Sequence, residues 1–560
     1  MNTQRYIQVL LPLKLEWEPV YALPEGSNAS IGDKIAVNFA GKNYVGIVTE
    51  TDVIPQENFD IKEAGSVNPG PSTSVIPGLT RNLKLLDFWR QLASYYLCTP
   101  GEVYKTALIP EKVQKRNHKK TEKAGVPVQL SLEQEAAYSS IIDAFSKHKT
   151  VLLEAPAGSG KTELYLRLAA DALSRGKSVL YLVPDISLTK QLEDKVGTVF
   201  PEVLAYYSGR TQLARHKIAI EVSSGARIVL GTKQALFLPF QDLGLIIVDQ
   251  EHDASFKHES PAPRYNARET AIMLAGIHGA NVILGSETPS LESLYNAQTG
   301  LFTKVQLKEN LNNEYVPGIN IINTSAEMRK DGMSGEFSLK LLEEIKAALD
   351  ANLPVIVLRT QRYSPLIEDE LSKFFPDANI QVCGRKDIRT VDLSGPGLCV
   401  IMHADIFLTQ PNFRSDERAL QLLRRLQGPD GNRRLVIQTH TPKHPVFQAL
   451  KNGSDALVFL EERRQFNLPP FTRLVDIIVE DNKEDRLRKV IPDLIRNLEQ
   501  ATGLSITPSF SGLSRESLIR ITLPRDHSLN SRKQAIYTAV EQFEKDHTYT
   551  GHIVIDVDPV

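Results

Sequence analysis

The chain has 560 residues, of which 42% are hydrophobic and 24% are charged, and its formal net charge at pH 7 is -2. This length allows three or four domains with real hydrophobic cores, and the charge excludes a chain that is basic throughout, so any nucleic-acid contact must come from local patches. Neither a run of about 18 apolar residues nor a secretory signal pattern is found, which predicts a cytoplasmic protein with no membrane partner.

The first hundred residues contain short stretches in which apolar and polar residues alternate. These stretches cover 7–13, 34–39 and 43–49, and the last two are joined at 40–42. Alternation of this kind is typical of half-buried strands, so a small β domain with a hairpin is predicted. A helix is expected near 83–96.

Two segments around this helix have the composition of connections. Residues 67–77 are rich in Pro, Gly and Ser, which favours a loop. Residues 112–123 are strongly basic, and such charge runs usually form solvated linkers. A strap that contacts DNA phosphates is the alternative interpretation of the basic run.

From Leu130 onward, short apolar runs alternate with helical segments. This alternation indicates a parallel sheet with flanking helices, and therefore an α/β fold. The expected strands lie at 150–154, 178–183, 227–230, 245–248 and 281–284. A second, weaker region of the same kind begins at Pro354 and runs through Val400 and Leu435, and an α+β region without a chemical motif follows it.

A glycine-rich loop follows the first of these strands and opens a helix. It consists of Ala155, Pro156, Ala157, Gly158, Ser159, Gly160, Lys161 and Thr162. In this context the loop turns backbone N–H groups toward phosphate, Lys161 reaches the β- and γ-phosphates, and Thr162 holds Mg²⁺. The loop predicts ATP and Mg²⁺ as cofactors, but a small-molecule kinase and a motor protein would both use it.

Further motifs surround the loop in a fixed order. They are 130–134, 182–189, 231–237, the sequence Asp249-Gln250-Glu251-His252, 263–268 and 285–290. This series resembles the PriA family of primosomal replication-restart helicases, in superfamily 2. The resemblance resumes at 404–423 and 461–471, and residues 32–48 and 95–103 resemble the family's DNA 3′-end-binding domain.

The resemblance implies a specific division of the chain. Two RecA-like helicase lobes are expected at 129–305 and 306–450, the second one shortened. A 3′-end-binding domain is expected at 1–110, a basic linker at 111–128 and a C-terminal domain at 451–560. The resemblance also places adenine recognition at Gln134, Mg²⁺ at Thr162 and Asp249, and catalysis at Lys161, Asp249, Gln250, Glu251 and His252.

Two residues depart from the family pattern near the reacting groups. Gln250 stands where the family has the Glu that acts as general base, and a carboxamide cannot take a proton from water. Glu251 could substitute only if its side chain turned toward the site, which ordinary local geometry disfavours. Glu287 stands where the family has Ala, either as a charge between the nucleotide and DNA sites or as a harmless exposed carboxylate.

Other departures lie in the second lobe. The family's cysteine-rich zinc module is missing after 355–360, and the three cysteines, Cys98, Cys383 and Cys399, are expected to be buried free thiols. The family's G-R-A-G-R, whose arginines contact ATP phosphates, is replaced at 428–432. Arg433 and Arg434 follow, but a shifted position rarely reproduces the geometry of an arginine finger.

These features lead to two main hypotheses. The first is a 3′-to-5′ DNA helicase of replication restart, which binds ATP and forked or 3′-ended DNA but hydrolyses ATP poorly. The second is a non-hydrolysing fork-binding scaffold that recruits replisome-loading proteins, with other primosome proteins and single-strand binding protein as possible partners. A P-loop enzyme acting on a small metabolite is disfavoured by the order of the motifs.

Overall fold

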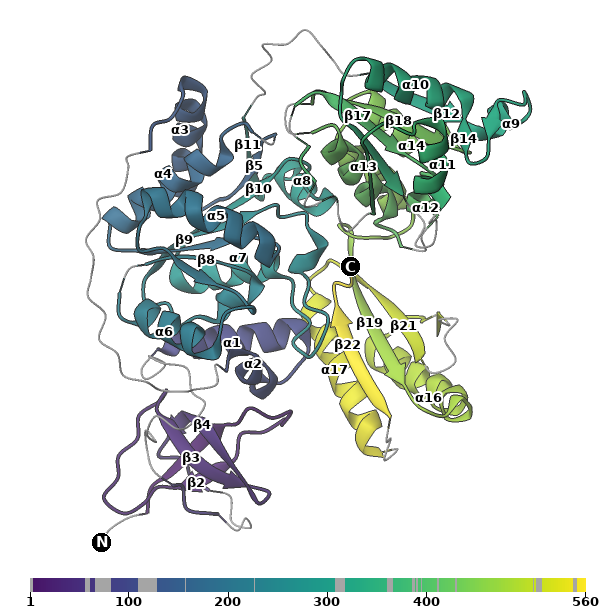
Figure 1. The fold of residues 1–560 in the computed structure, drawn as a ribbon. Coiled ribbons are helices and arrows are strands. Elements are labelled where there is room, and N and C mark those ends of the chain that lie inside the picture. The colour runs from purple at the N-terminus through teal and green to yellow at the C-terminus, as the bar shows by residue number, and fades with distance from the viewer. Residues whose placement is uncertain are drawn as a thin grey trace.

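The computed structural model describes residues 4–55, 61–65, 82–108, 128–156, 158–225, 227–307, 318–359, 366–384, 388, 391–393, 395–409, 412–428, 431–506, 508–509, 516–546 and 551–560. The loop predicted at 67–77 and the basic stretch at 112–123 lie outside these residues. Figure 1 shows a small N-terminal sheet, two larger α/β lobes and a C-terminal α/β part. Within the described residues, no helix has the length and apolar character needed to cross a membrane.

The N-terminal sheet is antiparallel and has the strand order β2-β1-β4-β3. Its strands are β1 (Tyr6–Leu10), β2 (Val20–Ala22), β3 (Lys34–Phe39) and β4 (Lys42–Thr51). Ala40 and Gly41 connect β3 to β4 with φ of 48° and 79°, the pair of left-handed conformations that a two-residue hairpin turn requires. The predicted hairpin is therefore confirmed.

Helices α1 (Leu83–Tyr96) and α2 (Pro100–Ala107) join this sheet to the first lobe. The side chain of Thr99 caps α2 in a reciprocal pair with Glu102, and Pro100 occupies the first turn, where its missing N–H costs nothing. On one side, the Tyr104 hydroxyl donates to the carbonyl oxygen of Val45 at 3.0 Å. On the other, the backbone N–H of Asn266 donates to the Tyr96 hydroxyl at 2.9 Å.

The first lobe contains a seven-stranded parallel sheet of order β11-β5-β10-β9-β6-β8-β7. Its strands are β5 (Thr150–Glu154), β6 (Ser178–Leu182), β7 (Leu204–Tyr206), β8 (Ile228–Gly231), β9 (Leu243–Asp249), β10 (Asn281–Ser286) and β11 (Phe302–Gln306). Its helices are α3 (Leu132–Ser146), α4 (Lys161–Ser174), α5 (Ile186–Val199), α6 (Gln212–Ser223), α7 (Ala267–His278) and α8 (Leu291–Gln298). The five inner strands match the predicted apolar runs, because parallel strands covered on both faces are apolar throughout.

The second lobe contains a five-stranded parallel sheet of order β12-β18-β17-β15-β16. Its strands are β12 (Ile319–Asn323), β15 (Val355–Arg359), β16 (Ile380–Gly384), β17 (Gly397–Ile401) and β18 (Arg433–Thr439). Its helices are α9 (Thr324–Met328), α10 (Leu339–Asp350), α11 (Leu366–Phe374), α12 (Asp405–Leu408), α13 (Ser415–Leu426) and α14 (Pro445–Lys451), and β13 (Met333–Ser334) pairs with β14 (Phe337–Ser338). Two free cysteines, Cys383 and Cys399, are buried in this lobe.

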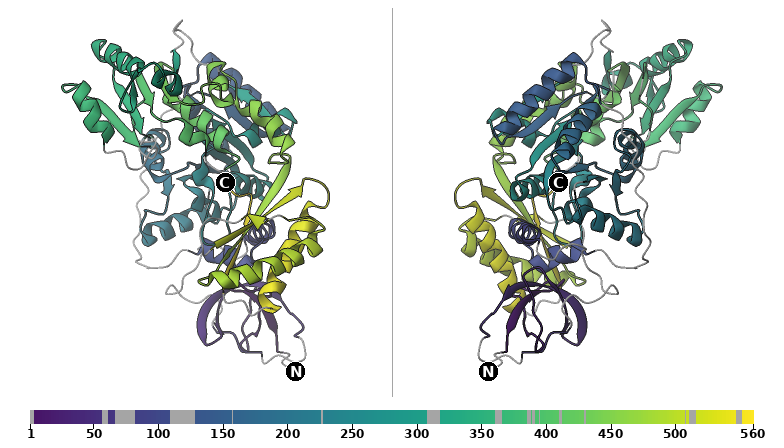
Figure 2. Two further views of the ribbon diagram at one scale, coloured as in Figure 1. Left: turned by 90° about the vertical axis from the view of Figure 1, so that its right-hand side faces the viewer. Right: turned by 90° about the vertical axis from the view of Figure 1, so that its left-hand side faces the viewer.

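The C-terminal part follows α15 (Leu460–Gln465) and is a second antiparallel sheet, of order β20-β21-β19-β22. It comprises β19 (Thr472–Glu480), α16 (Glu484–Thr502), β20 (Pro508–Ser509), β21 (Glu516–Pro524), α17 (Leu529–Asp546) and β22 (His552–Val557). Both views in Figure 2 show this part beside α1, at the end of the molecule that carries the N-terminal sheet. Lys257 of the first lobe fastens it, because its Nζ donates to the carbonyl oxygen of Val557 at 2.7 Å and pairs with Asp556 at 2.7 Å.

Candidate functional site

The glycine-rich loop lies between the end of β5 and the start of α4, at the carboxyl end of the parallel strands. Gly158 and Gly160 have φ of 79° and 85°, which residues with a Cβ rarely adopt. A Cβ added to Gly160 would lie 1.9 Å from Nε2 of Gln134, so the Gln134 side chain would have to move. The first turn of α4 begins at Lys161, and helix N-termini of this kind present backbone N–H groups to anions.

Gln134 lies against this loop and is bound at both ends of its amide. Its Oε1 accepts a hydrogen bond from the backbone N–H of Ser131 at 2.8 Å, and its Nε2 donates to the carbonyl oxygen of Gly160 at 3.2 Å. Ser131 and Gln134 together form a capping box at the start of α3. The spacing S-x-x-Q is typical of such a capping box, and the interpretation of Gln134 as an adenine-reading residue did not include this structural role.

Lys161 forms an ion pair with Glu287. Its Nζ lies 3.5 Å from Oε1 of Glu287, and the two side chains are 10% and 31% exposed. Glu287 is therefore half-buried and paired, not a freely exposed carboxylate. The Glu287 carboxylate is paired with Lys161, the lysine that the loop pattern assigns to phosphate binding.

Asp249 ends β9 and lies near Lys161. Removal of water by the surrounding protein raises the pKa of Asp249; nearby Lys161 opposes this effect and Glu287 adds to it. The hydroxyl groups of Tyr165 and Tyr181 each lie 3.4 Å from one of its carboxylate oxygens. Lys161 therefore lies close to Asp249, and Tyr181, which contacts Asp249, also contacts the side chain of Thr162.

Gln250 follows Asp249 with a φ of 54°, in the left-handed region that few non-glycine residues occupy. Its backbone N–H donates to Oδ1 of Asp249 at 3.1 Å. The next turn also holds His252, whose Nδ1 lies 2.7 Å from Oγ of Ser286 at the end of β10. Desolvation lowers the pKa of His252, which favours the neutral ring.

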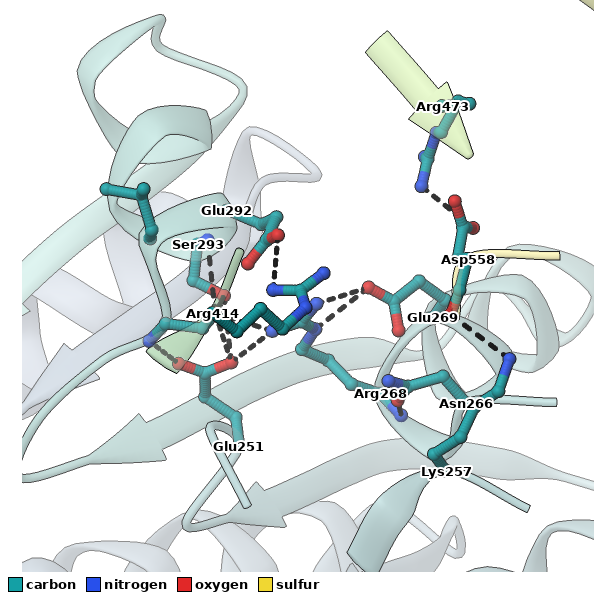
Figure 3. Close-up of polar contacts among 12 residues, drawn as sticks. Glu251, Lys257, Asn266, Arg268, Glu269, Glu292, Ser293, Arg414, Arg473 and Asp558 are labelled. Atoms are coloured by element: carbon teal, nitrogen blue, oxygen red, sulfur yellow. Dashed lines mark hydrogen bonds and ion pairs between the residues drawn. The ribbon is translucent and has the colours of Figure 1, made fainter. Parts of the chain in front are cut away.

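Glu251 points into a buried polar cluster (Figure 3). Its side chain is 0% exposed and pairs with Arg268, whose Nη1 lies 2.8 Å from Oε2. Oε1 accepts the backbone N–H of Ser290 at 2.6 Å, and Oε2 also accepts from the hydroxyl groups of Ser290 and Ser293, both at 2.9 Å. These contacts fix the Glu251 side chain in the protein interior and indicate a structural role for it.

The same cluster continues across the contact between the two lobes. Arg414 of the second lobe pairs with Glu292 at 2.6 Å, as Figure 3 shows. Glu417 of α13 accepts the backbone N–H of Leu291 at 2.8 Å and pairs with Arg463 at 3.0 Å. Gln421, one turn further along α13, donates to the carbonyl oxygen of Thr288 at 3.2 Å. Helix α13 therefore lies next to the turn that carries Glu287.

The two arginines that follow the replaced G-R-A-G-R segment are bound within the second lobe. Nε of Arg433 donates to the carbonyl oxygen of Leu393 at 3.0 Å, and Arg434 pairs with Glu344 at 2.6 Å. Arg424 and Arg425 lie in the last turn of α13, and a guanidinium N–H of Arg424 donates to the carbonyl oxygen of Ser454. Burial lowers the pKa of Arg424, and the charges of Asp455 and Glu154 oppose this shift.

A separate cavity of about 700 Å³ opens on the N-terminal sheet. Trp17, Tyr21 and Phe39 line it with apolar rings, and Gln8, Glu18 and Asn38 add polar groups. Trp17 is 56% exposed, and its ring centroid lies 6.1 Å from that of Phe39 in an edge arrangement. An exposed aromatic side chain beside a cavity of this size is suited to stacking on a planar ligand.

Comparison with known proteins identifies two family models in the chain. The model described as DEAD/DEAH box helicase matches residues 133–295, and the model described as 3′DNA-binding domain (3′BD) matches residues 8–109. Replication restart protein PriA of Rickettsia felis is 26% identical over 662 residues, covering 99% of both chains. Replication restart protein PriA of Bacillus subtilis is 26% identical over 549 residues, covering 80% of this chain and 68% of its own. The resemblance carried by the sequence motifs is confirmed.

Proposed function

We propose, from the premise that this chain is a divergent relative of the PriA replication restart proteins, that it binds ATP and forked or 3′-ended DNA and hydrolyses ATP slowly. The helicase-family and DNA-binding features belong to the confirmed resemblance. The slow hydrolysis is specific to this chain and rests on residues in the turn after β9. We expect the protein to act in the cytoplasm.

The environment of Glu251 carries the proposal of slow hydrolysis. Gln250 occupies the place of the general base and has no carboxylate to receive a proton from the attacking water. Glu251, the adjacent carboxylate, makes one ion pair and accepts hydrogen bonds from three donor groups around α8. Turning it toward the nucleotide would leave Arg268 buried without this partner, which is strongly unfavourable.

The glycine-rich loop fits the phosphate groups of a nucleotide. Gly158 and Gly160 leave space for a close approach of phosphate to the backbone, and Lys161 and the start of α4 supply positive charge. Thr162 and Asp249 are the residues that would hold Mg²⁺. ATP bound with Mg²⁺ would supply the phosphoanhydride bond, while these residues orient its phosphates.

DNA binding is proposed at the N-terminal sheet, within residues 1–110. The cavity beside Trp17 has aromatic rings on which a base can stack and polar groups that can bind a terminal hydroxyl. The two lobes, proposed at 129–305 and 306–450, and the C-terminal part at 451–560 would hold the duplex branches through phosphate contacts. Such contacts make the affinity depend on salt concentration.

Steady-state hydrolysis of ATP, measured with and without forked DNA, tests the proposal. We expect the natural protein to bind ATP but to hydrolyse it slowly, and Gln250→Glu to increase turnover by about 100-fold or more because general bases contribute this much. Lys161→Ala serves as the control that removes phosphate binding. Rapid DNA-stimulated turnover by the natural protein would contradict the proposal.

A second candidate function is a fork-binding scaffold that does not hydrolyse ATP and recruits replisome-loading proteins. It is favoured by Arg433 and Arg434, whose guanidinium groups are bound within the second lobe rather than at the nucleotide loop. If Gln250→Glu binds ATP but remains inactive with DNA, this second function is preferred. Pull-down with single-strand binding protein or other primosome proteins would then identify the partners.

A further inference from the structure

The ion pair between Lys161 and Glu287 places a carboxylate next to the nucleotide loop. Nζ of Lys161 and Oε1 of Glu287 are 3.5 Å apart, and only 10% of the lysine side chain is exposed. At this degree of burial the attraction is screened less by water and salt than a surface pair would be. Glu287 therefore competes directly with phosphate for the main positive side chain of the loop.

The turn that carries Glu287 is held on both sides. The carbonyl oxygen of Ser286 accepts the backbone N–H of Ala155 at 3.0 Å, and Oγ of Ser286 accepts the N–H of Thr288 at 2.9 Å. On the other side, Gln421 donates to the carbonyl oxygen of Thr288 at 3.2 Å. The backbone of Glu287 is therefore fixed between the nucleotide loop and α13, so the carboxylate cannot leave through a movement of this turn alone.

Asp249 also lies close to Lys161, but it is one of the residues that would hold Mg²⁺, so its charge would be offset by the metal ion. Glu287 is the carboxylate that stays paired with the ammonium group. A ligand with more negative charge near Lys161 is repelled more strongly than one with less.

We infer that Glu287 is a specificity-determining residue, which makes the loop bind nucleoside diphosphates in preference to nucleoside triphosphates. This inference rests on the proposed nucleotide binding. In a loop of this kind the lysine reaches the β- and γ-phosphates, so the γ-phosphate of a triphosphate would lie next to the Glu287 carboxylate. A diphosphate lacks that group and keeps the contacts of its two phosphates with the backbone N–H groups of the loop.

Equilibrium titrations of the full-length protein with ADP and with ATP, both with Mg²⁺, test this inference by calorimetry. We expect the natural protein to bind ADP more tightly than ATP. Glu287→Gln keeps the size of the side chain and removes its charge, and it should lower the ratio of the ATP Kd to the ADP Kd by about tenfold or more. Glu287→Ala should do the same.

Glu163→Gln provides the matched control. Glu163 lies in the first turn of α4 but pairs with Lys195 at 2.8 Å, so its removal changes the net charge equally without freeing Lys161. The inference is overturned if both nucleotides bind and neither Glu287 variant changes the Kd ratio, or if Glu163→Gln changes it equally. If the natural protein binds neither nucleotide, gain of ATP binding by Glu287→Gln supports the inference, whereas no binding by either protein overturns the nucleotide site itself.

Discussion

Glu251 accepts a hydrogen bond from the backbone N–H of Ser290 at 2.6 Å, and this contact ties the turn after β9 to the start of α8. The first turn of a helix has N–H groups without partners inside the helix, and an acidic side chain there satisfies one of them. Glu251 lies next to the position of the general base in sequence, yet its contacts belong to the framework that joins the two lobes. Its substitution should therefore affect stability first.

Glu251→Ala should lower the free energy of unfolding by about 3–5 kcal/mol. It removes one of the two carboxylates paired with buried Arg268 and leaves the N–H of Ser290 and the hydroxyl of Ser293 without this acceptor, whereas Glu269 still pairs with Arg268. Urea unfolding followed by circular dichroism measures this change. Glu461→Gln is the control, since Glu461 pairs with Arg464 at 3.9 Å on the surface and its side chain is 82% exposed. A loss of stability for Glu251→Ala no larger than that of the control would contradict the structural role.

Trp17→Ala should weaken binding to DNA with an accessible 3′ end, because stacking of a base on an aromatic ring contributes about 1–3 kcal/mol. The expected loss in affinity is therefore about 5-fold to 100-fold, measured by fluorescence anisotropy with fork substrates. Phe466→Ala is the matched control, because Phe466 is 62% exposed but lies outside the cavity. Equal losses for both variants would indicate that the cavity does not bind the DNA end.

His258 should make the protein less stable as the pH falls. Burial, with the nearby positive charge of Lys233, lowers the pKa of His258 to about 4. The unfolded chain has an ordinary histidine pKa of about 6.5 and takes up a proton first, so the free energy of unfolding decreases as the pH falls from about 6.5 to 4.

Unfolding of the His258→Gln variant by urea at pH 7.5 and pH 5 checks this expectation. The variant should lose less stability between the two pH values than the natural protein does. A residual loss remains, because burial also lowers the pKa of His278 to about 4. Exposed His527, changed to Gln, is the control and should leave the pH dependence as it is. An identical pH dependence in the natural protein and His258→Gln would exclude this contribution.

Lys257→Ala should loosen the C-terminal sheet from the first lobe. Its Nζ donates to the carbonyl oxygen of Val557 and pairs with Asp556, and its side chain is 3% exposed. The free energy of unfolding should therefore fall by about 3–5 kcal/mol. Lys177 pairs with Asp242 at 3.1 Å with 48% and 63% of the two side chains exposed, and Lys177→Ala should cost less than about 1 kcal/mol. Urea unfolding with limited proteolysis distinguishes local loosening from a global loss. Similar values for the two lysines would contradict the buried attachment.

The sequence predicts the central elements of the fold well and its edges poorly. Helix α1 and strand β5 occupy the predicted residues, since both have strong apolar patterns. Strands β7 and β11 form the two edges of the seven-stranded sheet, and the sequence does not predict them, because β7 has only three residues and three of the five residues of β11 are polar. Short or partly polar segments become strands only when a neighbouring strand offers hydrogen bonds.

Within the candidate site, local motifs were readable and long-range pairs were not. The glycine-rich loop has a compact pattern whose conformation follows from its own glycines. The pairing of Lys161 with Glu287 depends instead on two parallel strands, β5 and β10, that lie side by side. No spacing in the sequence reports that contact, although the motif comparison pointed to Glu287 as an unusual residue.

Helices α1 and α2 have a consequence for the geometry of any bound DNA. They bind the N-terminal sheet through Tyr104 and the first lobe through Tyr96, so the sheet is attached by packed helices rather than by a free tether. The sheet that carries the Trp17 cavity is therefore joined by packed helices to the lobe that carries the phosphate loop. If that cavity holds the 3′ end of a DNA strand, the first lobe would contact the strand a set number of nucleotides from its end. The protein would then measure the distance from a 3′ end to the branch point of a fork.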